Sequence, residues 1–183
     1  ADSKFQVSCI TLNDLILYAV ARTLPEHPEI NATCRNGDGG LEVVRSAVAH
    51  LAFAVDTPRV LMVPVIRDVG RLRVRELSAC AADLAERCRE RTITPGELSG
   101  GTFTVSNLGS FGVESFTPIL NSPQVAILGV GAVKWRSVDE QLVQQQIALS
   151  LTIDHRLIDG APAARFLQTL CMRLAELDVL LAL

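Results

Sequence analysis

Apolar residues recur with a helical period in three stretches of the chain. The first covers residues 12–24, where Thr11 and Asp14 provide an N-terminal capping pair and prolines end the pattern. The second covers residues 74–91 and has one apolar face opposite a charged one. The third covers residues 160–181. These patterns predict three amphipathic helices.

Stretches of β-branched and small residues between the helices predict strands. They cover residues 41–55, 60–66, 102–106, 125–133 and 147–153. Pro64, inside the second stretch, indicates an edge strand or a bulge. The polar segment 134–146 indicates a hairpin between the last two strands. Because strands and helices alternate only partly, we expect an α/β fold with a mixed central sheet.

The composition is that of one domain with an aliphatic core. The chain has 183 residues, of which 49% are hydrophobic and 4% aromatic, and its formal net charge is −3. The longest basic cluster, residues 67–75, is interrupted by apolar and acidic residues. It indicates a solvated turn and helix start, with a role near a phosphate-bearing cofactor left open. We therefore expect no nucleic-acid partner. Without an apolar run of membrane-spanning length or a signal peptide, we expect no membrane association either.

The five cysteines form neither a metal-binding nor a disulfide pattern. Their spacing is irregular and includes no Cys-x-x-Cys pair, which is typical of free thiols in a reducing compartment. Cys80 and Cys88 fall on or near the apolar face of the second helix, so we expect both to be buried. No histidine neighbours a cysteine in the sequence, so neither a metal site nor a cysteine nucleophile is predicted.

The segment around His155 is the strongest candidate for chemistry. The apolar strand 147–153 leads directly to Asp154 and His155, and Asp159 and Gly160 follow in the spacing His-x-x-x-Asp-Gly. An isolated histidine is most often a core residue that bonds to a carbonyl group. A histidine at a sharp strand-to-loop transition is instead exposed to a cleft. Because imidazole changes charge near neutral pH, His155 suits the role of a general base.

Asp159 admits three roles from the sequence. It can cap the final helix, with Pro162 in the first turn. It can pair with a buried arginine, or it can act directly in proton transfer. We favour a structural role, in which Asp159 fixes the loop that carries His155.

Ser106, at the end of a predicted strand, is the second candidate site residue. A strand-end serine is usually a turn former, but a partner of His155 would be a nucleophile or an oxyanion donor. No Gly-x-Ser-x-Gly elbow surrounds Ser106, which disfavours the nucleophile role.

Three motifs carry a family resemblance. They are Asp-His-Arg-x-x-Asp-Gly over residues 154–160, Gly-Gly-Thr-Phe-Thr-Val-Ser-Asn-Leu-Gly over 100–109, and the stretch 116–129, which contains Asn-Ser-Pro-Gln-Val-Ala-Ile-Leu-Gly. Together they resemble the dihydrolipoamide acyltransferases, the core components of 2-oxo acid dehydrogenase complexes. The His-x-x-x-Asp-Gly spacing alone is shared with chloramphenicol acetyltransferase and peptide-synthetase condensation domains, and the other two stretches make the narrower assignment specific.

This resemblance implies a fold, an assembly and a site. The fold would be a chloramphenicol-acetyltransferase-like two-layer sandwich with a mixed central sheet. Homotrimers would assemble into a cubic or dodecahedral core, and coenzyme A and the lipoyl arm would enter a channel between subunits from opposite ends. In that site, His155 would deprotonate a thiol, Ser106 of the neighbouring subunit would stabilise the oxyanion, and Asp159 would hold the histidine loop. No metal is required.

The implied reaction is transfer of an acyl group, with acetyl favoured, between dihydrolipoamide and coenzyme A. The implied partners are the lipoyl domain and the decarboxylase and dihydrolipoamide dehydrogenase components, in the bacterial cytoplasm or the mitochondrial matrix. Residues 1–183 would be the catalytic domain without part of its N-terminal segment, and they contain no lipoyl or subunit-binding domain.

Two alternatives remain: a non-catalytic scaffold subunit of the same fold, and another coenzyme A-dependent acyltransferase with the His-x-x-x-Asp-Gly motif. The intact set His155, Ser106 and Asp159 argues against the scaffold, which needs none of them.

Overall fold

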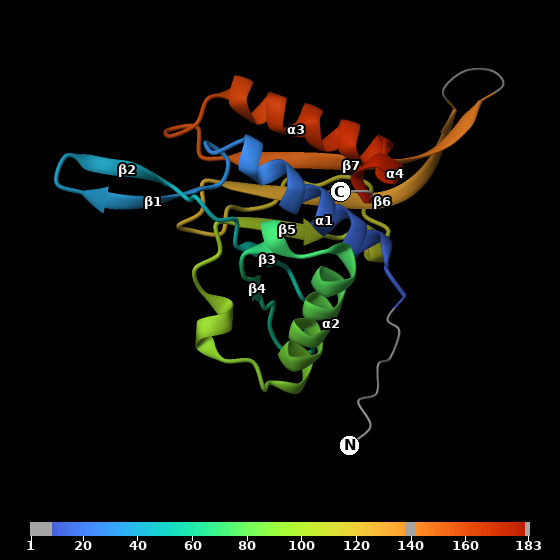
Figure 1. The fold of residues 1–183 in the computed structure, drawn as a ribbon, viewed down its shortest axis with the longest axis horizontal. Coiled ribbons are helices and arrows are strands. Elements are labelled where there is room, and N and C mark those ends of the chain that lie inside the picture. Colours follow the sequence, from blue (N-terminus) through green and yellow to red (C-terminus); the bar gives the residue numbers. More distant parts are fainter. Residues whose placement is uncertain (1–8, 138–141, 182–183) are drawn as a thin grey trace.

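A five-stranded mixed sheet forms the centre of the molecule (Figure 1). The structure is a computed structural model and describes residues 9–137 and 142–181. The strand order is β4-β3-β5-β6-β7, in which β3, β5 and β6 run parallel and the outer pairs are antiparallel. The strands are β3 (Leu51–Phe53), β4 (Val65–Ile66), β5 (Phe103–Asn107), β6 (Ala126–Ser137) and β7 (Val143–Ile153). The predicted mixed sheet is therefore confirmed.

Helices cover one face of this sheet, with α1 between α3 and α2 (Figure 1). The helices are α1 (Leu12–Thr23), α2 (Val74–Glu90), α3 (Gly160–Ala175) and the short α4 (Leu177–Leu181). Short 3-10 turns are η1 (Leu24–Glu26), η2 (Val69–Arg71), η3 (Pro95–Leu98) and η4 (Gly109–Phe111). The first two predicted helices are confirmed, and the third is divided into α3 and α4 at Glu176.

A capping box fixes the start of α1 and ties it to α2. The hydroxyl oxygen of Thr11 accepts the N–H of Asp14 at 3.2 Å, and the carboxylate of Asp14 accepts the N–H of Thr11 at 2.8 Å. The same carboxylate accepts the hydroxyl of Ser78, on α2, at 3.0 Å. The predicted capping pair is confirmed, and the buried carboxylate has the partners that burial requires.

The two faces of the sheet differ in chemistry. On the helix-covered face, Phe103, Val105 and Leu128 are buried in the hydrophobic core. Residues that pair directly across neighbouring strands point to the same face, and alternate residues point to opposite faces. The other face therefore carries a row of hydroxyl side chains from β5 and β7. This hydroxyl row consists of Thr104, Ser106, Ser150 and Thr152.

An irregular segment, residues 113–124, crosses the hydroxyl row, and we call it the strap. The carbonyl oxygen of Phe116 accepts the hydroxyl of Ser150 at 2.5 Å. The carbonyl oxygen of Pro118 accepts the hydroxyl of Thr152 at 2.7 Å. The hydroxyls of β7 thus satisfy backbone carbonyls that would otherwise lie against the sheet without a partner.

The strap approaches β6 closely where β6 has glycine. A Cβ atom on Gly131 would lie 1.9 Å from the carbonyl oxygen of Glu114, and one on Gly129 would lie 3.0 Å from Pro118. The N–H of Ala132 also donates to the carbonyl of Val113 at 2.7 Å. Glycine is needed at position 131 because any side chain would push the strap away from the sheet.

Two hairpins project from the body on opposite sides (Figure 1). One is formed by β1 (Ala32–Gly37) and β2 (Gly40–Arg45), a separate two-stranded sheet. The other is the distal part of β6 and β7, which pair out to Ser137 and Val143. Both arms of the hairpin predicted from the polar segment 134–146 are confirmed, and residues 138–141 lie outside the described part.

The strand predictions are wrong in detail between residues 41 and 66. The stretch predicted as one strand, residues 41–55, is divided into β2 and β3, which belong to different sheets. The stretch 60–66 is a regular strand only in β4, although the edge position indicated by its proline is confirmed. Composition alone does not locate the turn between two apolar segments.

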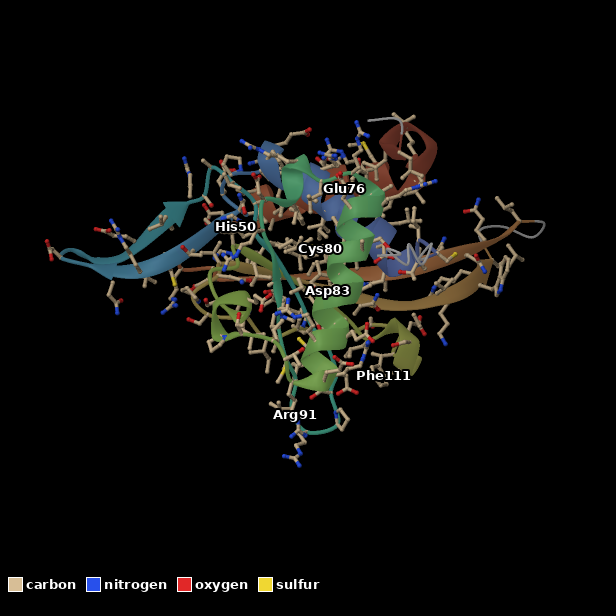
Figure 2. The ribbon with its side chains drawn as sticks, turned by 60° about the horizontal axis from the view of Figure 1, so that its bottom comes forward. His50, Glu76, Cys80, Asp83, Arg91 and Phe111 are labelled. Carbon is tan, nitrogen blue, oxygen red and sulfur yellow. The ribbon has the colours of Figure 1, made fainter. Side chains whose placement is uncertain are left out.

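Cys80 is exposed, so the prediction that both cysteines of α2 are buried is wrong for this residue. Figure 2 shows it on the outward side of α2 with Glu76 and Asp83. Cys88 is buried as predicted. At 3.6 residues per turn, positions eight apart differ by about 80° around the helix axis, which is enough to place one inside and the other outside.

Candidate functional site

His155 is exposed in the turn that follows β7. The N–H groups of Leu157 and Ile158 donate to the carbonyl of Asp154, each at 3.0 Å, and close the turn. The N–H of Asp154 donates to the carbonyl of Val125 at 2.9 Å, which ties the turn to the start of β6. Because Ile158 is buried, the turn is anchored in the core while the imidazole of His155 faces outward.

The charged residues on either side of His155 pair with each other. The carboxylate of Asp154 accepts the Nε of Arg156 at 2.9 Å, its terminal nitrogen at 2.6 Å and its backbone N–H at 3.1 Å. These hydrogen bonds hold the pKa of Asp154 below its ordinary value. The pair braces the turn from both sides of His155.

Asp159 occupies the N-cap position of α3, with an extended backbone, but its side chain makes no capping hydrogen bond. Within residues 9–137 and 142–181, its carboxylate also forms no ion pair with an arginine. The helix cap and the arginine pair considered for Asp159 are therefore not formed by its side chain within the described part of a single chain. The backbone of Asp154 holds the turn instead.

Ser106 is half-buried at the end of β5. The other three members of the hydroxyl row all donate hydrogen bonds. The hydroxyl of Thr104 donates to the side-chain oxygen of Gln124 at 2.5 Å, and those of Ser150 and Thr152 donate to the strap. In the part of the chain that the structure describes, the hydroxyl of Ser106 has no such partner and is available to a ligand.

The structure does not bring Ser106 and His155 together within one chain. Ser106 pairs with Gly129 on β6, which in turn pairs with Ser150 on β7. His155 lies five residues farther along the chain than Ser150. Two strand spacings and five residues of rise separate the two side chains by roughly 20 Å. A site that uses both must combine two copies of the chain.

A cavity of about 530 Å³ opens where β5 ends. Its wall comes from the start of α1, the end of β5, η4 and β6, and its polar members include Asn13, Asn107, Ser110 and Lys134. The cavity begins one residue beyond Ser106 in the chain.

Among the described residues, no three or more His, Cys, Asp or Glu side chains are grouped to hold a metal ion. No helix within these ranges has the length and apolarity needed to cross a membrane. The side chains at the candidate site are an imidazole, a carboxylate and a hydroxyl.

The basic cluster 67–75 forms the exposed turn and helix start that the sequence predicts, with Arg71, Arg73 and Arg75 exposed, whereas Arg67 holds a neighbouring loop. The guanidinium of Arg67 donates to the carbonyls of Gly96, Ser99 and Gly100 at 2.9, 2.5 and 3.2 Å. Next to it, the Nδ1 of His50, labelled in Figure 2, accepts the N–H of Asp68 at 3.1 Å. Burial and the nearby Arg67 lower the pKa of His50. Arg67 therefore holds the loop before β5 in place.

Two features of the site region were missed from the sequence. One is the hydroxyl row, whose signal is the alternation of hydroxyl residues at 104 and 106 and at 150 and 152. The other is a hydrogen bond of 2.9 Å between the side chains of Asn107 and Asn13, which lie 94 residues apart. No local pattern indicates a contact over that separation.

Comparisons with known proteins show the family of the chain. Residues 1–182 match the family described as 2-oxoacid dehydrogenases acyltransferase (catalytic domain). The chain is 42% identical over 175 residues to the dihydrolipoyllysine-residue acetyltransferase component of pyruvate dehydrogenase complex from Pseudomonas aeruginosa, covering 94% of this chain and 32% of that protein. The chain thus spans about a third of the length of this curated relative.

Solved structures give the same result. One, from a study of a serine, a histidine and an asparagine in the catalytic mechanism of Azotobacter vinelandii dihydrolipoamide acetyltransferase, has a TM-score of 0.86 at 41% identity. Another, the cubic core of the pyruvate dehydrogenase multienzyme complex, has a TM-score of 0.86 at 40% identity. Each comparison covers 94% of this chain and 71% of the other.

A chloramphenicol acetyltransferase, at 16% identity, shares the fold with a TM-score of 0.56 over 87% of this chain and 76% of its own. The fold class and the family resemblance inferred from the sequence are both confirmed. The chain belongs to the acyltransferase family of the 2-oxoacid dehydrogenases and matches its catalytic domain.

Proposed function

We propose that residues 1–183 act as the acyltransferase catalytic domain that moves an acetyl group between dihydrolipoamide and coenzyme A. The observation that carries the proposal is the hydroxyl of Ser106, which has no hydrogen-bond partner among the described residues, in a row whose other hydroxyls are all bonded. A half-buried hydroxyl without a partner among the described residues is a donor that an oxyanion can accept from. Relatives that carry the acetyltransferase name support the choice of acetyl.

His155 is the general base in this mechanism. Its imidazole takes the proton of the coenzyme A thiol, and the thiolate sulfur attacks the thioester carbonyl carbon of acetyl-dihydrolipoamide. The new C–S bond forms as the carbonyl becomes an oxyanion, which accepts a hydrogen bond from Ser106. Collapse of the intermediate breaks the original C–S bond, and the imidazolium returns its proton to the departing dihydrolipoamide sulfur. The reverse direction uses the same groups.

Two copies of the chain share each site, since a single chain holds Ser106 and His155 roughly 20 Å apart. We propose that the copies form a homotrimer within a larger core, as the cubic core found for a similar structure suggests. Exposed apolar side chains on the strap and the distal hairpin, such as Ile119 (89% exposed) and Trp135 (68% exposed), support burial against further copies.

The partners of the proposed complex are a lipoyl domain that carries the dihydrolipoyl group, a decarboxylase and a dihydrolipoamide dehydrogenase. The names of the relatives, which refer to a pyruvate dehydrogenase complex, support this set. Because those relatives are bacterial, we place the complex in the bacterial cytoplasm rather than in a mitochondrion.

A mixing experiment tests the shared site. Ser106→Ala should lower kcat by about 10²–10³-fold, the usual effect of losing one oxyanion donor. His155→Ala should lower it by about 10²–10⁴-fold. Co-expressing the two variants in equal amounts should restore about a quarter of the wild-type sites. Each site takes His155 from one chain and Ser106 from another, and each of these residues is intact in half of the chains. Acetyl transfer from acetyl-coenzyme A to dihydrolipoamide is the measurement.

The controls separate the alternatives. Each variant alone should stay inactive while assembling to the wild-type size in light scattering. Near-wild-type turnover by His155→Ala would contradict the mechanism, and an inactive wild type of the correct size would favour a scaffold subunit. Faster transfer to simple amines or alcohols than to dihydrolipoamide would indicate a different acceptor. No gain on mixing would contradict the shared site alone.

A further inference from the structure

We infer that Asn107 is a positioning residue for Ser106, an inference that rests on the proposed function. Asn107 follows Ser106 directly at the end of β5 and points to the opposite, helix-covered side of the sheet. Its side-chain nitrogen donates to the side-chain oxygen of Asn13, on α1, at 2.9 Å. Its side-chain oxygen accepts the N–H of Gly109 at 2.9 Å.

These two bonds hold the strand end from both sides. Asn13 lies in the first turn of α1, which the Thr11–Asp14 capping box fixes and which Ser78 ties to α2. The contact with Gly109 folds the chain back immediately after the strand, and the N–H of Leu108 donates to the carbonyl of Val130 at 3.0 Å. One amide group therefore connects the end of β5 to α1 and to its own following turn.

The turn allows little displacement. A Cβ atom on Gly109 would lie 2.7 Å from the carbonyl oxygen of Gly131 and 3.0 Å from the side-chain oxygen of Asn107. The segment is thus held between Asn107 on one side and β6 on the other. The hydroxyl of Ser106 has no hydrogen bond within the described residues, so the region it can reach is set by the position of its Cβ atom and hence by the backbone that Asn107 fixes. Oxyanion stabilisation is sensitive to such placement.

The surroundings of Asn107 make a test practical. Asn107 and Asn13 both line the cavity of about 530 Å³ at the end of β5. Water can therefore enter when either side chain is shortened, and the backbone groups released by the substitution can be solvated. A truncated variant should fold and still lose the fixed direction of the strand end.

The experiment is a double-mutant cycle between Asn107→Ala and Ser106→Ala, read as kcat and KM for acetyl transfer by the assembled protein. We expect Asn107→Ala to lower kcat about tenfold, less than the loss of the hydroxyl itself, with KM changed less than twofold. In the Ser106→Ala background, Asn107→Ala should have no further effect. A purely structural residue would reduce kcat equally in both backgrounds, and that result would overturn the inference, as would an unchanged kcat in Asn107→Ala.

Three further variants separate a positioning effect from misfolding. Asn13→Ala breaks the same bond from α1 and should reproduce the effect, and Asn13→Asp, which keeps an acceptor oxygen for Asn107, should retain most activity. Asn36→Ala, at the exposed end of β1, is the matched control and should leave kcat unchanged. If Ser106→Ala alone leaves kcat unchanged, the oxyanion role in the proposed function fails, and the positioning role fails with it. If Ser106→Ala lowers kcat as expected and Asn107→Ala lowers kcat equally in both backgrounds, only the positioning role is overturned.

Discussion

At the scale of single residues, Asp159 is a proposed site residue whose side chain forms neither of the structural contacts considered for it within the described residues. It caps no helix through its side chain, although its backbone stands at the N-cap of α3. In the Azotobacter vinelandii study the asparagine named with the catalytic histidine follows it by four positions, as Asp159 follows His155 here. An amide and a carboxylate both offer an oxygen that accepts a hydrogen bond, and only the carboxylate is charged.

We therefore expect Asp159→Asn to retain activity within about threefold, while Asp159→Ala loses tenfold or more. The amide keeps an acceptor oxygen of the same shape, whereas alanine keeps none. Initial rates of acetyl transfer by the two assembled variants give the comparison. Equal losses in both would show that the negative charge is required, and equal retention would show that the side chain is dispensable.

Residue-level prediction from the sequence succeeded where chemistry is encoded locally. The Thr11–Asp14 capping box follows from two residues three apart, and the exposed turn of His155 follows from the end of an apolar strand. The contact between Asn107 and Asn13 depends on packing between distant segments, so no local pattern contained it. The prediction for Cys80 was wrong because a small apolar residue is compatible with either side of the border between the apolar and the polar face of a helix.

At the scale of elements, a bidentate ion pair joins α2 to η3. The guanidinium of Arg87 donates to both carboxylate oxygens of Glu97 at 2.6 Å. Thr94 also donates to this carboxylate, through its N–H at 2.9 Å and its hydroxyl at 2.6 Å. The hydrogen bonds from Arg87, with those from Thr94, lower the pKa of Glu97 from 4.5 to about 2.

This pKa predicts an acid-dependent contribution to stability. Because the pKa of Glu97 is lower in the folded state, its ionised form stabilises folding above pH 4.5, and the effect is lost as the pH falls from 4.5 to about 2. Wild type should thus have a higher Tm than Glu97→Gln at neutral pH, and the difference should disappear towards pH 2. Thermal unfolding across this range is the measurement. Exposed Glu90→Gln serves as the control, and a constant difference at all pH values would contradict the assignment.

Element-level prediction succeeded for the helices, which have a clear helical period, and for most of the central strands, which consist of β-branched and small residues. It was less successful between residues 41 and 66, where one apolar stretch supplies strands to two sheets. The division depends on the pairing of β3 with β4 and β5, which is a tertiary contact and not a local sequence pattern.

At the scale of the whole molecule, Phe166 joins the helical layer to the sheet. It is fully buried, and its ring lies 5.4 Å from that of Phe103 on β5 and 5.6 Å from the ring of His27, which it meets edge to face. We expect Phe166→Ala to lower the free energy of unfolding by about 3–5 kcal/mol, the range for emptying a core aromatic site.

Phe111, labelled in Figure 2, provides the matched control because it is 63% exposed. Phe111→Ala should change the free energy of unfolding by less than about 0.5 kcal/mol. Urea unfolding at one fixed protomer concentration compares the two variants, since assembly makes stability depend on concentration. Similar losses of unfolding free energy in both variants would show that the contact of Phe166 between the helices and the sheet is not what stabilises the fold.

The roughly 20 Å between Ser106 and His155 in one chain has a genetic consequence. If each site takes Ser106 from one chain and His155 from another, as proposed, a defect at either residue alone inactivates about half of the sites in a cell that makes normal and defective chains in equal amounts. A chain defective at both residues inactivates about three quarters, because each site draws on two chains. A mixture of two chains that each carry one of the two lesions also retains about a quarter of its sites, so two lesions leave the same activity whether they lie on one chain beside a normal chain or on separate chains.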